Sequence, residues 1–260
     1  MQAGFSGSGD PTSANREAIV YEGDSGARRS LTYAALKREV DGLAAGLRRL
    51  GVGRGDRVAL FVPPVPEAAV TIMACARIGA IVVPAFSGYG SESLATRLNA
   101  GEACVLVTVD GTTRRGAPVH MKAIADGAVA SAPSVRHVIV VANNGAEVPM
   151  TAGRDHRWTD VVGEAGGDRS MLMLEPNDPL FIVFTSGTTG APKGIVHSHL
   201  GLLVKTALDF GYGFDIQQDD VLAWIADMGW ALGPMMIVGG LHLGATVVTV
   251  EGLPDHPGPD

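Results

Sequence analysis

Apolar residues recur every third or fourth position after Thr32, and this spacing predicts an amphipathic helix. The apolar stripe consists of Leu36, Val40, Leu43, Leu47 and Leu50. Thr32 is a favoured residue type at a helix N-cap, and Gly51 is a favoured residue type just beyond a helix end. We therefore predict a helix that begins after Thr32 and ends before Gly51.

Short apolar runs alternate with further helical segments as far as residue 141. Buried strands are predicted at 57–62, 80–84, 104–109 and 135–141, and helices at 67–78, at 91–99 with Ser91 as the cap, and at about 121–129. Strands that alternate with helices of this length pair in parallel, with helices over the sheet. The fold class is therefore predicted to be α/β, with layered parallel sheets flanked by helices.

The segment 143–178 breaks this pattern because it is polar, rich in glycine and interrupted by Pro149 and Pro176. A connection of this length often marks a subdomain boundary or a surface excursion, and only 158–162 within it is expected to be ordered. We predict a first α/β subdomain at 13–142, this irregular connection, and a second α/β subdomain at 179–260 that is incomplete. The glycine- and serine-rich residues 1–12 are expected to be disordered.

The most informative stretch joins a short apolar strand, Phe181–Phe184, to the polar sequence T-S-G-T-T-G-A-P-K-G at 185–194. Glycines allow successive backbone N–H groups to turn toward one anion. Hydroxyl groups add donors, and Lys193 adds a positive charge. The predicted phosphate-binding residues are Thr185, Ser186, Gly187, Thr188, Thr189, Gly190 and Lys193, with Lys193 as the candidate catalytic residue. This composition predicts a site for a nucleoside triphosphate.

Two other interpretations account less well for this loop. A plain turn between two strands needs neither four hydroxyls nor a lysine. The P-loop spacing G-x-x-x-x-G-K-[ST] is absent, since Ala191 and Pro192 follow Gly190 and Gly194 follows Lys193. The loop is thus expected to join strand to strand, without a helix N-terminus at the phosphates.

Charge and composition exclude several classes of protein. The chain has 260 residues, 18% of them charged, and a net charge of −7, which argues against nucleic acid as a partner. No signal peptide is visible and the apolar runs are too short to span a bilayer, so no membrane association and a cytoplasmic location are expected. Cys75 and Cys104 lie in apolar surroundings and are expected to be buried thiols.

The loop at 185–194 resembles the signature loop of the adenylate-forming superfamily. Three further segments are similar to acetyl-CoA synthetase-like short-chain acyl-CoA synthetases, namely 64–80, D-M-G-W-A-L-G at 227–233 and E-G-L-P-D-H-P at 251–257. The resemblance implies an AMP-forming ligase that uses ATP, Mg²⁺, a small carboxylic acid and CoA, by way of an acyl-adenylate. It also implies that a C-terminal domain and several later motifs are missing, so the chain alone is expected to be a truncated portion inactive in adenylation.

The resemblance also suggests roles for two groups of residues. D-G-T-T-R-R-G-A-P-V at 110–119 is similar to the segment whose arginines bind CoA phosphates, which points to Arg114 and Arg115, although such a pair is commonly only a solvated surface patch. Trp230, Ala231 and Leu232 correspond to the acyl pocket. Acetate-using relatives typically have Val and Thr after this Trp, so acetate is not assigned.

No metal-binding residues are predicted, because His197 and His199 lack a third ligand nearby. Two other functions stay open beside an acyl-CoA synthetase. One is an adenylate-forming ligase that loads a carrier protein, and the other is a non-catalytic nucleotide-binding module.

Overall fold

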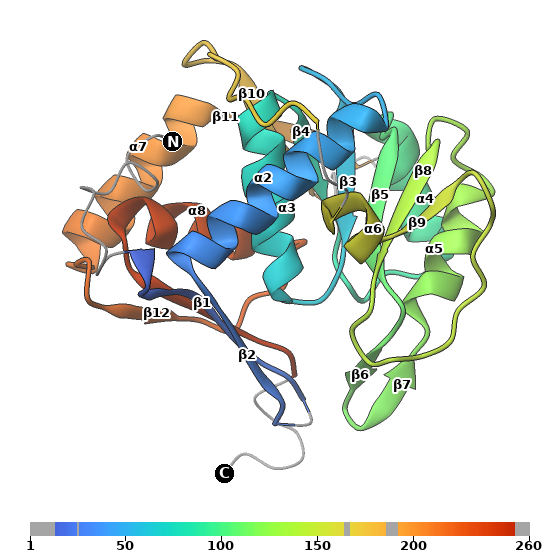
Figure 1. The fold of residues 1–260 in the computed structure, drawn as a ribbon, viewed down its shortest axis with the longest axis horizontal. Coiled ribbons are helices and arrows are strands. Elements are labelled where there is room, and N and C mark those ends of the chain that lie inside the picture. The colour runs from blue at the N-terminus through green and yellow to red at the C-terminus, as the bar shows by residue number, and fades with distance from the viewer. Residues whose placement is uncertain (1–13, 25, 164–166, 186–191, 253–260) are drawn as a thin grey trace.

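The computed structural model describes residues 14–24, 26–163, 167–185 and 192–252. These residues form two main sheets, a small hairpin and the helices around them. The arrangement is the mixed α/β architecture of parallel strands flanked by helices that the sequence predicts (Figure 1).

The larger sheet has seven strands. Their order is β11 (Lys193–Ser198), β10 (Pro179–Thr185), β4 (Ile81–Pro84), β3 (Arg57–Phe61), β5 (Val105–Val109), β8 (His137–Val141) and β9 (Asp155–Arg157). All neighbouring pairs are parallel except β10 and β11, which form an antiparallel hairpin. The central strands β4 and β5 are buried along their whole length and are almost entirely apolar, as is typical of parallel strands that are covered on both faces.

The smaller sheet has four strands, in the order β12 (Val221–Ala223), β13 (Thr246–Val250), β1 (Glu17–Glu22) and β2 (Arg28–Thr32). β13 pairs in parallel with β12 and β1, and β2 is antiparallel to β1. The sequence analysis missed β1 and β2. β2 carries mostly polar residues and lies at an exposed edge, so its composition gives little strand signal.

Two helices, α2 (Tyr33–Arg49) and α3 (Pro66–Ile78), cross the middle of the molecule, and α3 contacts strands of both sheets (Figure 1). α4 (Ser91–Ala100) and α5 (Met121–Val129) pack on each other beside the larger sheet. α7 (His199–Thr206) continues into the π-helix η1 (Ala207–Gly213), and both contact α8 (Leu232–Leu243). These elements place the carboxyl ends of strands from both sheets around one cavity.

The helix caps test two predictions. Thr32 caps α2 as predicted, since its Oγ1 accepts a hydrogen bond from the Ala35 N–H at 3.1 Å. The prediction for Ser91 is wrong, because Gly90 is the N-cap of α4 and no side chain caps this helix. Ser91 instead donates a hydrogen bond to the Ile124 carbonyl at 2.9 Å, which joins α4 to α5.

The connection at 143–178 is more ordered than expected. It contains β9 and α6 (Trp158–Gly163), and β9 forms an edge of the larger sheet. Sheet membership does not follow the predicted division, because β10 and β11 extend the larger sheet while β1 and β2 pair beside β13. The two-domain division at 13–142 and 179–260 stays a prediction, and residues 1–12 lie outside the described residues.

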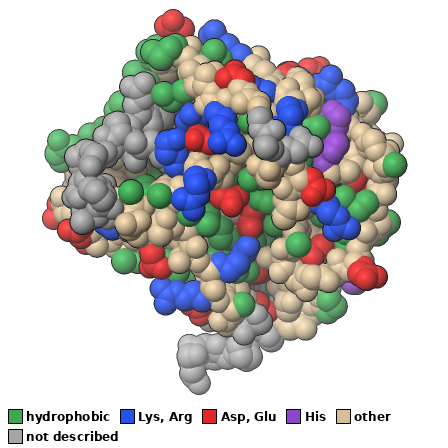
Figure 2. Space-filling view, in the orientation of Figure 1, with side chains coloured by type: hydrophobic (Ala, Val, Ile, Leu, Met, Phe, Trp, Pro, Cys, Tyr) green, Lys and Arg blue, Asp and Glu red, His purple; other side chains and the backbone are tan. Residues whose placement is uncertain are grey.

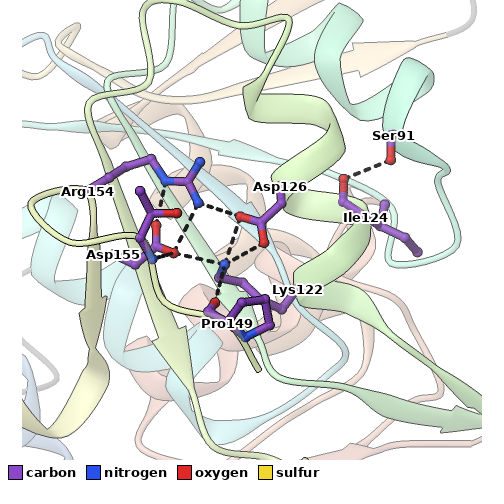
Figure 3. A network of polar contacts seen from close by, with 8 residues as sticks. Ser91, Lys122, Ile124, Asp126, Pro149, Arg154 and Asp155 are labelled. Atoms are coloured by element: carbon purple, nitrogen blue, oxygen red, sulfur yellow. Dashed lines mark hydrogen bonds and ion pairs between the residues drawn. The ribbon is translucent and has the colours of Figure 1, made fainter. Parts of the chain in front are cut away.

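A buried ionic network attaches β9 to α5 (Figure 3). The ammonium group of Lys122 is fully buried and contacts Asp126 at 2.7 Å and Asp155 at 2.9 Å, and it donates to the Pro149 carbonyl at 3.0 Å. Arg154 contacts both carboxylates as well. All three N–H donors of Lys122 therefore have partners, which offsets the desolvation of a buried charge.

The surface carries mixed charges over the face that Figure 2 shows, with basic and acidic side chains interspersed. Apolar side chains reach the surface along α7 and η1, where Leu200, Val204 and Leu208 are about half exposed.

In the part of the chain that the structure describes, no helix has the length and apolar character needed to cross a bilayer. Cys75 and Cys104 are buried free thiols, as predicted.

Candidate active site

A cavity of about 580 Å³ lies where parallel strands of both sheets end. Residues just beyond β3, β4 and β5 line one side, and residues just beyond β12 and β13 line the other. Ligands of open α/β sheets bind at the carboxyl ends of the strands. This position makes the cavity the leading candidate for a substrate site.

Arg114 reaches this cavity from a hairpin that the sequence analysis missed, β6 (Thr112–Arg114) paired with β7 (Ala117–Val119). Its Nη2 donates a hydrogen bond to Ser87 Oγ at 2.8 Å. Its guanidinium group lies 5.4 Å from the centre of the Phe86 ring, a cation–π distance. Arg114 is therefore a held side chain at a cavity and not a solvated surface arginine.

Arg115, the second predicted arginine, has a different setting. It lies in the turn of the same hairpin with a φ of 51°, is exposed, and is not among the residues that line the cavity. The structure thus separates the predicted pair. Only Arg114 joins the other candidate residues.

The carboxylate of Asp227 anchors this wall of the cavity. It accepts hydrogen bonds from the Ser87 hydroxyl, from the Ser87 N–H at 3.2 Å and from the Gly229 N–H at 2.8 Å. Burial raises the pKa of Asp227 above its usual range, although these hydrogen bonds and the nearby charge of Arg114 oppose the rise. The sequence analysis quoted the D-M-G-W segment without assigning Asp227 a role, and it missed Ser87.

The predicted acyl-pocket residues follow Asp227 closely in the sequence. Trp230 is 63% exposed, so it is not a core residue, and its ring meets Phe86 edge-on at 6.1 Å between ring centres. Trp230 and Leu232 both line the cavity, while Ala231 precedes α8, is exposed and does not line it. Two of the three predicted residues therefore lie together beside Arg114.

Close backbone packing explains the glycines around Trp230. A Cβ atom on Gly229 would lie 2.1 Å from the Phe86 backbone nitrogen, and one on Gly233 would lie 2.5 Å from the Asp227 carbonyl oxygen. Real side chains do not approach so closely. These glycines therefore let backbone segments pack directly against each other.

Glu251 is a second buried carboxylate at the cavity, at the end of β13. It accepts hydrogen bonds from the hydroxyls of Tyr21 and Thr112 and, at 3.1 Å, from the Asn143 amide. Burial raises the pKa of the Tyr21 phenol, and the carboxylate of Glu251 raises it further. Glu251 thereby ties the Arg114 hairpin to the smaller sheet. No pattern in the sequence predicts this role.

The predicted phosphate loop begins at the same end of the larger sheet, where its parallel strands have their carboxyl ends. Thr185 ends β10, whose neighbour β4 runs parallel to it, and Lys193 is paired with Thr185 at the start of β11. Both residues are exposed. Ser186, Gly187, Thr188, Thr189 and Gly190 lie outside the described residues, so the structure gives no geometry for their predicted phosphate contacts.

Histidines and carboxylates do not gather into a metal site in the described ranges, where no group of three or more such residues with cysteine lies within reach of one ion. His197 belongs to β11, whereas His199 begins α7 and is buried with its Nε2 unpartnered. The two histidines therefore belong to different elements. Burial lowers the pKa of His199, so its imidazole is neutral at pH 7.

Comparison with known proteins identifies the class. The family model described as "AMP-binding enzyme" matches residues 10–259, and the chain belongs to this family. The fold and the resemblance stated from the signature loop agree with this assignment.

Particular relatives are acyl-CoA synthetases. The chain is 40% identical to the acetyl-coenzyme A synthetase of Chlorobaculum tepidum and 44% identical to that of Streptomyces coelicolor, over 94% of its length in each case. Its structure matches that of acetoacetyl-CoA synthetase from Streptomyces lividans with a TM-score of 0.91 and 30% identity, over the whole of this chain. The chain spans 37%, 38% and 39% of the lengths of these three proteins.

Proposed function

We propose that the chain supplies the acid- and CoA-binding wall of an AMP-forming acyl-CoA synthetase. The observation that carries the proposal is the convergence of Arg114, Trp230 and Leu232 on one cavity from segments far apart in the sequence. An arginine suits the phosphates of CoA, and an apolar lining suits the organic part of a carboxylic acid. The named relatives, which are acetyl- and acetoacetyl-CoA synthetases, support the same chemistry.

The proposed reaction has two halves. A carboxylate oxygen attacks the α-phosphorus of ATP and displaces pyrophosphate, and the CoA thiol then attacks the acyl carbon of the adenylate and releases AMP. Two anions must approach each other in the first half, so the protein contributes mainly position and positive charge. Lys193 and the loop that begins at Thr185 are proposed to hold the ATP phosphates. Arg114 is proposed to bind CoA in the cavity, with Arg115 near CoA at the entrance.

Mg²⁺ is proposed to be held chiefly through the ATP phosphates. The hairpin of β10 and β11 offers the hydroxyl group of Thr185 and the ammonium group of Lys193, which suit the phosphate oxygens that would carry the ion. When bound, the ion would neutralise phosphate charge.

A cytoplasmic location is also proposed, because such an enzyme would use cytoplasmic metabolites.

The acid itself is proposed to differ from acetate. Leu232 lines the cavity where the resemblance places a threonine in acetate-using enzymes. A changed methylene or hydroxyl in such a pocket alters selectivity by about 1–3 kcal/mol. A panel of acids of increasing chain length would therefore give its strongest binding with an acid other than acetate.

Equilibrium titration of the 260-residue chain with CoA and with ATP, alongside a pyrophosphate-release assay, tests the proposal. We expect CoA binding that Arg114→Ala weakens, ATP binding that Lys193→Ala weakens, and no pyrophosphate release by this chain alone. ATP binding without CoA binding would favour a ligase that loads a carrier protein or a non-catalytic nucleotide-binding module. Acid-dependent pyrophosphate release that is lost in Lys193→Ala would contradict the expected inactivity of the chain alone.

A further inference from the structure

The guanidinium group of Arg114 is connected to a buried carboxylate through a single hydroxyl group. Arg114 Nη2 donates to Ser87 Oγ at 2.8 Å, and Ser87 Oγ donates to Asp227 Oδ2. Ser87 is buried, with only 3% of its surface exposed. These three residues come from the hairpin β6–β7, the segment after β4 and the segment after β12.

The direction of both hydrogen bonds follows from the chemistry of the groups. An arginine has only N–H donors, so Ser87 Oγ must accept from Arg114. The one hydroxyl proton of Ser87 therefore points elsewhere, and Asp227 Oδ2 is the acceptor within reach. Asp227 is itself fixed by the N–H groups of Ser87 and Gly229. The hydroxyl cannot rotate without losing one of these partners.

Arg114 also keeps donors for a ligand. Among the residues that the structure describes, its hydrogen bond to Ser87 uses one of its five N–H groups. The Phe86 ring covers one side of the guanidinium at 5.4 Å, and a Cβ on Gly88 would lie 2.4 Å from Nη1. The side chain is thus confined on two sides while it lines the cavity.

We propose that Ser87 is a positioning residue that holds Arg114 in the orientation needed to bind a phosphate group of CoA. The proposal rests on the proposed use of CoA. It goes further, because it assigns the arginine's orientation to the pair of Ser87 and Asp227. An arginine held in advance binds a phosphate without losing the freedom of a mobile side chain.

Trp230 lies close to the same group of residues. The Asp227 carbonyl accepts a hydrogen bond from the Trp230 N–H at 3.2 Å, and Phe86 contacts both Arg114 and Trp230. The Ser87 hydroxyl bonds to Arg114 and to the Asp227 carboxylate, whereas Trp230 bonds to the Asp227 backbone carbonyl. A change in Ser87 should therefore affect CoA binding more than the binding of an uncharged acid analogue at Trp230. This difference separates a positioning role from general damage to the site.

The test compares CoA binding among matched variants of the 260-residue chain. Ser87→Ala should weaken CoA binding about tenfold, the size expected for one charge-assisted hydrogen bond. Ser87→Thr, which keeps the hydroxyl, should bind within about threefold of the parent chain. Ser93→Ala, an exposed serine of α4 outside the cavity, is the control and should leave CoA binding unchanged. Adding Ser87→Ala to Arg114→Ala should cause no further loss, because both changes remove one interaction.

A second readout does not depend on CoA. In nuclear magnetic resonance spectra, the guanidinium N–H signals of Arg114, assigned with Arg114→Lys, should report restricted rotation that Ser87→Ala releases. Loss of this restriction in a chain that does not bind CoA would support the positioning role and contradict the proposed use of CoA. Unchanged rotation in Ser87→Ala, or CoA affinity equal to that of the parent chain, would overturn the positioning role.

Folding is checked by the thermal unfolding of each variant. If Ser87→Ala does not fold, Asp227→Asn replaces it, because that change keeps the volume but removes the charge that orients the hydroxyl. Asp227→Asn should then free Arg114 rotation and weaken CoA binding in the same way. An Asp227→Asn chain with restricted Arg114 and full CoA affinity would overturn the positioning role.

Discussion

At the scale of single residues, the site depends on where two backbones touch. Gly229 lies against the backbone of Phe86, so any side chain there forces the Asp227 and Ser87 segments apart. Glycines therefore matter to this site as well as the polar groups proposed to contact ligands.

Gly229→Ala should destabilise the chain by about 1–3 kcal/mol, because a Cβ would lie 2.1 Å from a backbone nitrogen that cannot move freely. Urea unfolding monitored by circular dichroism measures the change. Gly163→Ala is the control, since a Cβ there meets nothing within 4 Å. Equal stability of Gly229→Ala and the parent chain would show that the close contact is absent.

The sequence predicted some site residues and missed others for physical reasons. Trp230 and Leu232 belong to a segment whose residue types resemble a known motif, so a motif sufficed. Ser87 and Asp227 act through a contact between residues 140 positions apart, and no local pattern encodes such a contact. Arg115 looked equivalent to Arg114 in sequence, but the turn of the hairpin points the two to different surroundings.

At the scale of elements, local signals predicted the helices well. The cap at Thr32, the apolar stripe of α2 and the glycine after it all agree with the structure. Strand β9 and the hairpin β6–β7 are three residues per strand, too short for periodicity to reveal.

Thr32→Ala should lower the stability of the chain by about 1 kcal/mol, because the Ala35 N–H at the start of α2 loses its acceptor. Thr96→Ala is the matched control. Thr96 is an exposed residue inside α4, where alanine is the better helix former. Thermal unfolding that shows no loss for Thr32→Ala relative to Thr96→Ala would contradict the capping role.

The ionic network of Figure 3 is expected to stabilise the attachment of β9 to α5. Lys122→Met should cost about 3–5 kcal/mol, since it leaves the buried carboxylate of Asp155 without its buried cation. Lys37→Met is the control, because Lys37 is half exposed and its pair with Asp41 should contribute at most about 0.5 kcal/mol. Denaturant unfolding in which both variants lose the same stability would show that the network does not hold β9.

At the scale of the whole molecule, the same network links stability to pH. Burial alone would raise the pKa of Asp155, but hydrogen bonds from Arg154, the Thr151 N–H and Lys122 outweigh it and lower this pKa to about 2. A lowered pKa in the folded state means that the carboxylate stabilises the fold above about pH 4, its unfolded value, and that this contribution is lost as the pH falls toward 2.

The stability difference between the parent chain and Asp155→Asn should therefore shrink as the pH falls from about 4 to about 2. Unfolding free energies measured at several pH values in this range give the comparison. A difference that stays constant would mean that Asp155 does not titrate with folding.

The whole fold shows what the sequence alone could and could not predict. The α/β class followed from alternating strands and helices, which is a local pattern. The assignment of strands to sheets did not, because β1 pairs with β13, more than 220 positions later in the chain. The cavity likewise depends on long-range contacts, since residues at the end of β13 line it together with residues that follow β3, β4 and β5.

The central claim is that this cavity holds the acid end of an acyl-adenylate beside Trp230. Titration with a non-hydrolysable acyl-adenylate analogue, followed by tryptophan fluorescence, tests it most directly. The account predicts saturable binding with a fluorescence change that disappears in Trp230→Phe and persists in Trp158→Phe, whose indole lies outside this cavity. Absence of saturable binding, or a fluorescence change that survives in Trp230→Phe, would contradict the account.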